Sequence, residues 1–141
     1  MTKPFILHAT CVAVAGKGVL ITGPAGSGKS ALALQLMALG GVLVADDRTV
    51  LSETEGQIVA TAPKAISGMI EARGVGLLHV PFQTSVPVTL AVDMSRTQAQ
   101  RLPEPETMTV LDIPLPCLHK VDAPYFPAAI LAYIKGNGSE A

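Results

Sequence analysis

The chain has 141 residues, of which 49% are apolar and 15% are charged, and its formal net charge is −1. This length favours one domain over residues 1–141, large enough to bury a core without disulfides or structural metals. The scattered Lys and Arg residues form no basic stripe, which argues against a nucleic-acid partner. No cleavable leader is recognisable and no apolar run approaches the ~20 residues that cross a bilayer, so we expect a cytoplasmic protein without membrane contact. Cys11 and Cys117 lie in no C-x-x-C motif and are expected to be ordinary reduced thiols.

Apolar runs and glycines predict alternating strands and a helix in the first third of the chain. A strand is expected over residues 6–14, and a short β-branched strand over 18–22 follows a glycine turn. Strong helix formers then predict a helix over 29–39, which the paired glycines at 40 and 41 should end. A second buried strand is expected over 42–45.

Between the strand 18–22 and the helix lies an octapeptide that completes the phosphate-binding pattern G-x-x-x-x-G-K-[ST]. Its glycines permit backbone conformations in which successive N–H groups turn toward phosphate oxygens, helped by the helix dipole. Lys29 adds positive charge for the β- and γ-phosphates, and Ser30 supplies the hydroxyl that typically binds Mg²⁺ in such loops. The predicted nucleotide-binding residues are Gly23, Pro24, Ala25, Gly26, Ser27, Gly28, Lys29 and Ser30.

Two carboxylates, Asp46 and Asp47, follow the strand 42–45 in a Walker B-like position. Adjacent strand residues point to opposite faces, so the two carboxylates need different partners. We assign Asp46 to the metal beside Ser30 and Asp47 to the general base, with the reverse assignment also open. His8 lies inside the apolar first strand, and its residue type alone leaves two interpretations: a hydrogen-bonded core residue or a member of the active site.

The second half of the chain carries fewer signals. The expected elements are a hairpin of residues 49–51 and 57–61, a short helical stretch that opens at 63 and stops near 73–74, strands over 76–80, 88–92 and 108–113, a loop over 81–87, a helix over 124–134 and a frayed tail over 136–141. The sequence therefore predicts an α/β protein with a mixed sheet and few helices.

Three segments together resemble the catalytic domain of the HPr kinase/phosphorylase family, in the family's order and near its spacing. They are Leu7-His8 with the stretch from Gly16 through the phosphate loop, Leu43 to Asp47, and Ala62-Pro63 with the stretch from Ile70 to Gly76. Family members phosphorylate a serine of the phosphocarrier protein HPr, which regulates the phosphotransferase system, and can reverse the reaction with inorganic phosphate. The resemblance implies a P-loop-containing mixed β-sheet flanked by few helices, of the HPr kinase/PEP carboxykinase type. It covers residues 7–76.

Carried over to these positions, the resemblance implies that Lys29 and Ser30 hold MgATP and that Glu71 is a metal ligand with Ser30 and Asp46. It places His8 in the active site. It also implies that Asp47 takes the serine proton and returns it in the reverse reaction. An HPr-type partner and a homo-oligomer, hexameric in the family, are implied in the same way.

Departures from the family pattern suggest a short form of the kind found in some bacteria. The acidic residue that commonly follows the loop serine is Ala31 here, and residues 81–87 replace a loop containing glycine and arginine. The family's N-terminal domain is expected to be absent because His8 lies near the chain start, and its C-terminal Gly-Arg-Asn pattern is not found around residues 122–127. Whether the reverse reaction survives stays open.

The sequence as a whole predicts an Mg²⁺- and ATP-dependent serine protein kinase. Two alternatives stay open. One is a small-molecule kinase, for which Arg96 and Arg101 are the candidate lid residues. The other is a binding module that senses ATP and transfers nothing.

Overall fold

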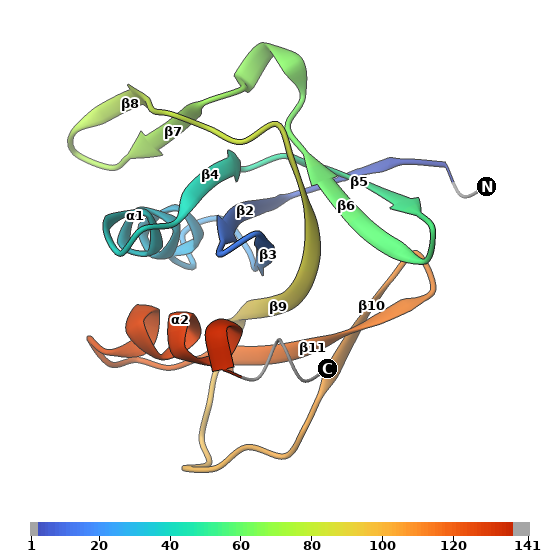
Figure 1. Cartoon of the computed structure of the whole chain (residues 1–141). Coiled ribbons are helices and arrows are strands. Elements are labelled where there is room, and N and C mark those ends of the chain that lie inside the picture. The colour runs from blue at the N-terminus through green and yellow to red at the C-terminus, as the bar shows by residue number, and fades with distance from the viewer. Residues whose placement is uncertain (1–2, 137–141) are drawn as a thin grey trace.

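Strands make up most of the structure, and two helices cover one face of the main sheet (Figure 1). The computed structural model describes residues 3–136. In chain order the elements are β1 (Phe5–Leu7), β2 (Ala9–Val14), β3 (Lys17–Thr22), α1 (Lys29–Ala38), β4 (Val42–Ala45), β5 (Thr49–Thr54), β6 (Gln57–Thr61), the 3₁₀ turn η1 (Lys64–Ile66), β7 (Met69–Ala72), β8 (Gly76–His79), β9 (Ser85–Thr97), β10 (Thr107–Val110), β11 (Ile113–Lys120) and α2 (Phe126–Gly136). The predicted mixed α/β class is confirmed.

The main sheet has the strand order β1-β5-β6-β9-β3-β2-β4, and β11 pairs with both β9 and β10. β3, β9 and β11 are parallel to one another, whereas β2 is antiparallel to both β3 and β4. It follows that β4, β3, β9 and β11 all run in one direction, and their carboxyl ends open at one edge of the sheet. That edge is where α/β proteins generally bind ligands.

Side chains of the central strands alternate between two cores. On the face under the helices, Val12 of β2 and Ile21 of β3 pack against Leu36 of α1 and Ile130 of α2. On the other face, Cys11 and Leu20 pack against apolar residues of the curled outer strands β5, β6 and β10. Period-2 alternation of apolar residues in β2 and β3 thus fills both faces of the sheet, which explains why these strands read as continuous apolar runs.

Helix α1 ends as its sequence predicts. Gly40 adopts a φ of +106°, which glycine tolerates best, and its N–H donates to the Met37 carbonyl at 3.1 Å. The Gly41 N–H donates to Leu36 at 2.8 Å. A Cβ at Gly41 would lie 2.8 Å from the Val12 side chain, so the close approach of β2 requires glycine there.

Two predicted elements of the first half are corrected by the structure. The strand expected over 6–14 is interrupted by a bend at His8, because β1 leaves to pair with β5 while β2 pairs with β3 and β4. The helical stretch expected from 63 to about 73 is wrong beyond Ile66. Gly68 turns the chain with a φ of +73°, and Met69–Ala72 forms a hairpin with β8.

The second half also differs from expectation in its strands. The loop over 81–87 ends early, because β9 begins at Ser85 and continues to Thr97. The strand expected over 108–113 is the end of β10, a left-handed turn at Leu111 and Asp112, and the start of β11. The sequence does not predict the whole of β11, because it contains Pro114 and Pro116 and proline has no N–H for strand pairing. Both lie where β11 pairs with β10 alone, so their missing N–H groups are tolerated.

The final helix begins two residues later than expected and includes Gly136. The rest of the predicted tail, residues 137–141, lies outside the described residues. Among the helices of residues 3–136, neither α1 nor α2 has the length and apolar character needed to span a membrane.

Candidate functional site

A glycine-rich loop joins the carboxyl end of β3 to α1. Gly23, Gly26 and Gly28 adopt φ angles of 142°, 82° and 99°, which side-chain-bearing residues rarely reach. The Ser27 N–H closes the turn by donating to the Pro24 carbonyl at 3.1 Å. A Cβ at Gly23 would also lie 2.7 Å from Ser27 Oγ. The loop conformation therefore depends on these glycines.

The first turn of α1 presents unused donors. Gly28 is the N-cap and provides no side-chain cap, and the first helical hydrogen bond runs from the Leu32 N–H to the Gly28 carbonyl at 3.0 Å. The N–H groups of Lys29, Ser30 and Ala31 consequently have no acceptor within residues 3–136. Such N–H groups and the positive end of the helix dipole together attract anions.

Lys29 is a buried cation without an anionic partner. The residue is 7% exposed, and its Nζ donates to the Gly23 carbonyl at 2.7 Å and to the Pro24 carbonyl at 3.1 Å. No ion pair of the described residues includes Lys29. An ammonium group has a third donor, and a buried charge that meets only neutral acceptors is costly. An anion bound beside Lys29 would offset that cost.

Asp46 is a buried carboxylate held by neutral donors. Its Oδ1 accepts hydrogen bonds from Ser30 Oγ at 2.7 Å and from Thr10 Oγ1 at 3.0 Å, and its Oδ2 accepts one from the Glu71 N–H at 3.3 Å. The residue is 7% exposed. Asp46 and Lys29 therefore carry opposite buried charges on the two sides of the loop–helix junction without pairing with each other.

Asp47 has a different partner from Asp46. Its carboxylate Oδ1 pairs with His8 Nε2, and both side chains are more than half exposed. Asp47 adopts a left-handed φ of 68° after the strand, and its N–H donates to Thr10 Oγ1 at 3.4 Å. The exposed His8–Asp47 pair thus sits at the surface directly beside the buried Asp46 group.

The structure brings most of the predicted site residues together. Lys29, Ser30, Asp46, Asp47 and His8 lie around the carboxyl ends of β3 and β4, and Glu71 reaches Asp46 through its backbone N–H while its side chain is exposed. The described residues hold no cluster of three or more His, Cys, Asp or Glu side chains that could bind a metal by itself.

Sequence reasoning missed Thr10. Its hydroxyl is fully buried, donates to the Asp46 carboxylate and accepts from the Asp47 N–H, so it fixes the Asp46 carboxylate and the Asp47 backbone relative to β2. The available signal was a single hydroxyl residue in the otherwise apolar run Ala9–Val14. A buried hydroxyl needs a hydrogen-bond partner.

The fold and site define the class of this chain: an α/β protein with a G-x-x-x-x-G-K-[ST] loop between strand and helix, and a carboxylate pair at the same sheet edge. Residues 1–116 match a family model described as the HPr Serine kinase C-terminal domain. The chain therefore belongs to the HPr kinase/phosphorylase family.

Relatives and a solved structure agree with this membership. The chain is 37% identical to an HPr kinase/phosphorylase of Geobacillus kaustophilus over 91% of its length and 44% of the relative's. It is 48% identical to one of Clostridium tetani over 53% of its length and 25% of the relative's. The chain thus spans less than half the length of these two relatives. The structure of the Hpr(Ser) kinase/phosphatase from Coxiella burnetii superposes with a TM-score of 0.81 at 25% identity, over 96% of this chain and 97% of that one.

Proposed function

We propose that this protein is an Mg²⁺- and ATP-dependent serine kinase that phosphorylates an HPr-type phosphocarrier protein. The observation that carries the proposal is the pair of unmatched buried charges. Within residues 3–136, Lys29 has no anionic partner and Asp46 has no cationic partner. Ser30 follows Lys29 in the first turn of α1 and donates a hydrogen bond to Asp46, so the two charges lie near each other. A nucleotide's phosphates and a metal ion would satisfy both.

The loop suits the phosphates of ATP. The N–H groups of Lys29, Ser30 and Ala31 supply neutral donors, and Lys29 Nζ supplies a charged one. A phosphate oxygen that replaced a loop carbonyl at Nζ would make a charge-assisted hydrogen bond, which is shorter and stronger than a neutral one. These residues would bind and orient the phosphates, which is most of what enzymes contribute to phosphoryl transfer.

The oxygen donors beside the loop suit Mg²⁺. Ser30 Oγ and Asp46 Oδ1 lie 2.7 Å apart, and the exposed Glu71 side chain begins next to them. Mg²⁺ is usually bound by one or two carboxylates together with substrate phosphates, and it would stabilise negative charge on the transferring group. Ser30, Asp46 and Glu71 are the residues that would hold it. The methyl group of Ala31 offers no further ligand.

Asp47 is the group that would act on the acceptor. Its carboxylate is exposed to an incoming serine hydroxyl, whereas Asp46 is buried. His8 holds Asp47 in place, and the carboxylate would accept the hydroxyl proton as the bond to phosphorus forms. By microscopic reversibility the same group would return that proton if the protein also dephosphorylates its partner with inorganic phosphate.

The remaining parts of the proposal come from the family. An HPr-type protein as acceptor, a role in regulating the phosphotransferase system, a cytoplasmic location and a homo-oligomeric, hexameric assembly are expected for this chain as for the family it resembles. The relatives that carry the name HPr kinase/phosphorylase support the acceptor most directly.

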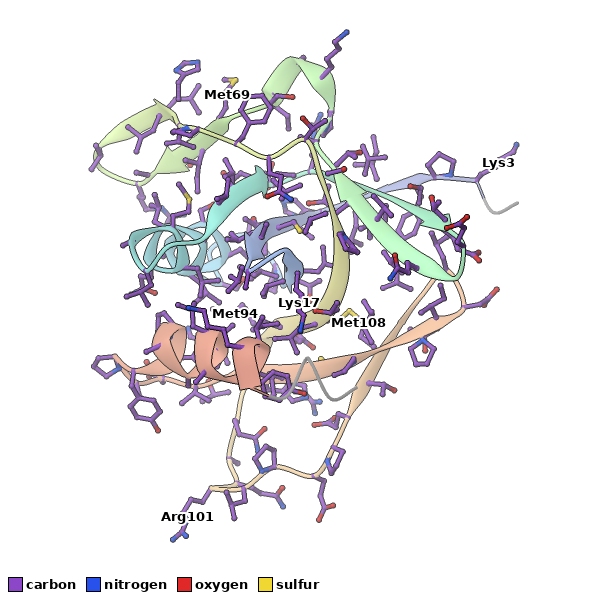
Figure 2. The ribbon with its side chains drawn as sticks, in the orientation of Figure 1. Lys3, Lys17, Met69, Met94, Arg101 and Met108 are labelled. Carbon is purple, nitrogen blue, oxygen red and sulfur yellow. The ribbon has the colours of Figure 1, made fainter. Side chains whose placement is uncertain are left out.

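One observation favours the alternative of a small-molecule kinase. A cavity of about 690 Å³ lies between the connection from β9 to β10 and helix α2, with Arg101, Glu106 and His119 in its wall. Within residues 3–136, however, neither candidate lid arginine makes a hydrogen bond or ion pair with the phosphate-binding loop. Arg96 is engaged by Glu106 at 3.9 Å and by His119 at 3.4 Å, and Figure 2 shows Arg101 at the outer tip of the connection, pointing away from the molecule.

The decisive experiment is incubation of the purified protein with MgATP and a purified HPr-type protein, followed by intact mass spectrometry. We expect the carrier to gain one phosphoryl group on a serine, and Lys29→Met to abolish the gain. ATP hydrolysis or binding without a gain on the carrier would refute the proposed acceptor. Binding without any turnover would leave the ATP-sensing module as the better description.

A further inference from the structure

The cavity of about 690 Å³ beside α2 is separate from the phosphate-binding site. Its wall, as residues 3–136 form it, includes none of the loop residues 23–30. Asp46 and Asp47 follow β4, which lies on one side of β3 in the sheet. β11 and the connection from β9 to β10, which bound the cavity, lie on the other side (Figure 1). A molecule in this cavity would lie across the sheet from Asp47, so the cavity suits a ligand other than a phosphoryl acceptor.

The connection from β9 to β10, residues 98–106, forms one wall of the cavity along nearly its whole length. It is anchored to β11 at both ends. At one end the Gln98 N–H donates to a β11 carbonyl at 2.7 Å, and at the other the Glu106 carbonyl accepts from a β11 N–H at 2.9 Å. Pro103 and Pro105 restrict the backbone between these anchors. The fold itself therefore forms this wall of the cavity.

Aromatic side chains line the opposite wall. The chain has three Phe, two Tyr and no Trp, and both tyrosines, Tyr125 and Tyr133, line the cavity together with Phe126. Leu118 of β11 and Ile130 of α2 add apolar surface. Aromatic side chains pack well against other rings, and the volume lies within the range of sites for small organic molecules. The wall therefore suits a ligand with an apolar ring system.

One polar side chain in the wall, His119, has an unused hydrogen-bonding atom. The residue is only 9% exposed. Its Nε2 lies 2.9 Å from Glu106 Oε2, a carboxylate oxygen that can only accept, so the Nε2–H is the donor. Its Nδ1 is buried and has no hydrogen-bond partner within residues 3–136. A buried polar atom without a partner is costly, so a ligand group that bonded to Nδ1 would remove that cost.

A hydroxyl matches Nδ1 in either protonation state of the ring. Nδ1 is an acceptor in the neutral ring and a donor in the charged ring, and a hydroxyl can both donate and accept. The charged groups that face His119 are Asp93, Glu106 and Arg96. Two carboxylates against one guanidinium give an anionic ligand no advantage here, and Arg101 points away from the molecule (Figure 2). A neutral hydroxyl compound therefore fits better than a phosphate or a carboxylate.

We propose that this cavity binds a neutral ring compound that carries a hydroxyl group. The ring would lie between the aromatic wall of α2 and the connection 98–106, and the hydroxyl would bond to His119 Nδ1. The proposal adds a second ligand site to the protein and does not depend on the proposed kinase function, because it uses neither the loop nor the carboxylates.

The test uses 2-naphthol and 2-methylnaphthalene, in which a methyl group replaces the hydroxyl. Because the chain has no Trp, the binding of 2-naphthol to the full chain can be followed by its own fluorescence, and 2-methylnaphthalene can be measured as a competitor. We expect saturable binding of 2-naphthol. In His119→Phe, which keeps a ring but removes both nitrogens, the affinity for 2-naphthol relative to 2-methylnaphthalene should fall about fivefold, the factor that one neutral hydrogen bond is typically worth.

Two neighbouring alanines of α2 provide a variant and its control. Ala129 lines the cavity, so Ala129→Trp should fill it and abolish the binding of 2-naphthol. Ala128 is equally exposed and does not line the cavity, so Ala128→Trp should bind like the wild type. The proposal is overturned by a wild-type protein without saturable binding, by an Ala129→Trp protein that binds like Ala128→Trp, or by an unchanged affinity ratio in a folded His119→Phe protein. None of these results would affect the kinase proposal.

Discussion

Replacing Thr10 by valine tests whether the site depends on how Asp46 is held. Valine has nearly the shape of threonine, so the substitution removes one hydroxyl from a fully buried position without opening a cavity. The loss comprises the 3.0 Å hydrogen bond to the Asp46 carboxylate and the longer one, at 3.4 Å, from the Asp47 N–H. Asp46 would keep Ser30 and the Glu71 N–H as donors.

The size of the effect follows from the charge of the acceptor. A hydrogen bond to a charged group contributes about 1.5–3 kcal/mol, and the long bond to Asp47 adds little. We expect the free energy of unfolding to fall by that amount, which lowers the urea midpoint by about 1 M for a chain of this size. If the transition state of phosphoryl transfer loses the same free energy of stabilisation, the transfer slows by about 10- to 150-fold.

Two further variants make the result interpretable. Thr10→Ser keeps the hydroxyl and should restore most of the transfer rate. Thr49→Val removes another fully buried hydroxyl, which donates to the neutral Ala9 carbonyl at 2.8 Å. We expect Thr49→Val to lose only about 0.5–1.5 kcal/mol of stability and to transfer at the wild-type rate. The reasoning is wrong if Thr10→Val unfolds and transfers like the wild type, or if Thr10→Ser is as impaired as Thr10→Val.

The other predictions concern the loop, the base and a buried thiol. Lys29→Met removes a buried charge that has no ion-pair partner within residues 3–136, so we expect a urea midpoint equal to or above that of the wild type. The same variant should lose ATP binding in calorimetry. Retained binding would remove Lys29 from the mechanism. Asp47→Asn should lower kcat far more than it raises KM for ATP, and a change in KM alone would refute the role of base. Burial raises the pKa of the Cys11 thiol to about 12. The unfolded chain ionises first, so the stability from this thiol is complete below pH ~9 and is lost as the pH rises toward ~12. The difference in urea midpoint between wild type and Cys11→Ala should therefore shrink above pH ~9. A difference that stays the same at every pH would contradict this.

Local patterns made the loop, helix α1 and the β4 carboxylates predictable. The octapeptide from Gly23 to Ser30 specifies its own turn through glycine, and the helix that follows consists of strong helix formers ended by Gly40-Gly41. In each case the residues that determine the structure are adjacent in sequence. The nucleotide motif was therefore the easiest part of the site to recognise.

The rest of the site depends on contacts between distant segments. The His8–Asp47 pair joins residues 39 positions apart, and the Thr10–Asp46 bond joins residues 36 apart. His8 alone is compatible with either a core or a site residue, and only the bend between β1 and β2 brings it to Asp47. The local preference of the residues in β7 predicts a helical stretch there. Pairing with β8 outweighs that preference and makes the segment a strand.

The parallel pairing of β3 with β9 has a consequence for how the protein assembles. Gly18 is paired with Val88, and Thr22, the last residue before the phosphate loop, is paired with Asp93. A fragment that ended before Ser85 would contain the whole octapeptide and both aspartates, yet it would lack the strand against which the loop is built. Contacts of such long sequence separation form late and slowly in folding. The recognisable motif is thus complete early in synthesis, whereas the sheet edge at which we propose that the nucleotide binds is complete only after the chain has emerged through β9.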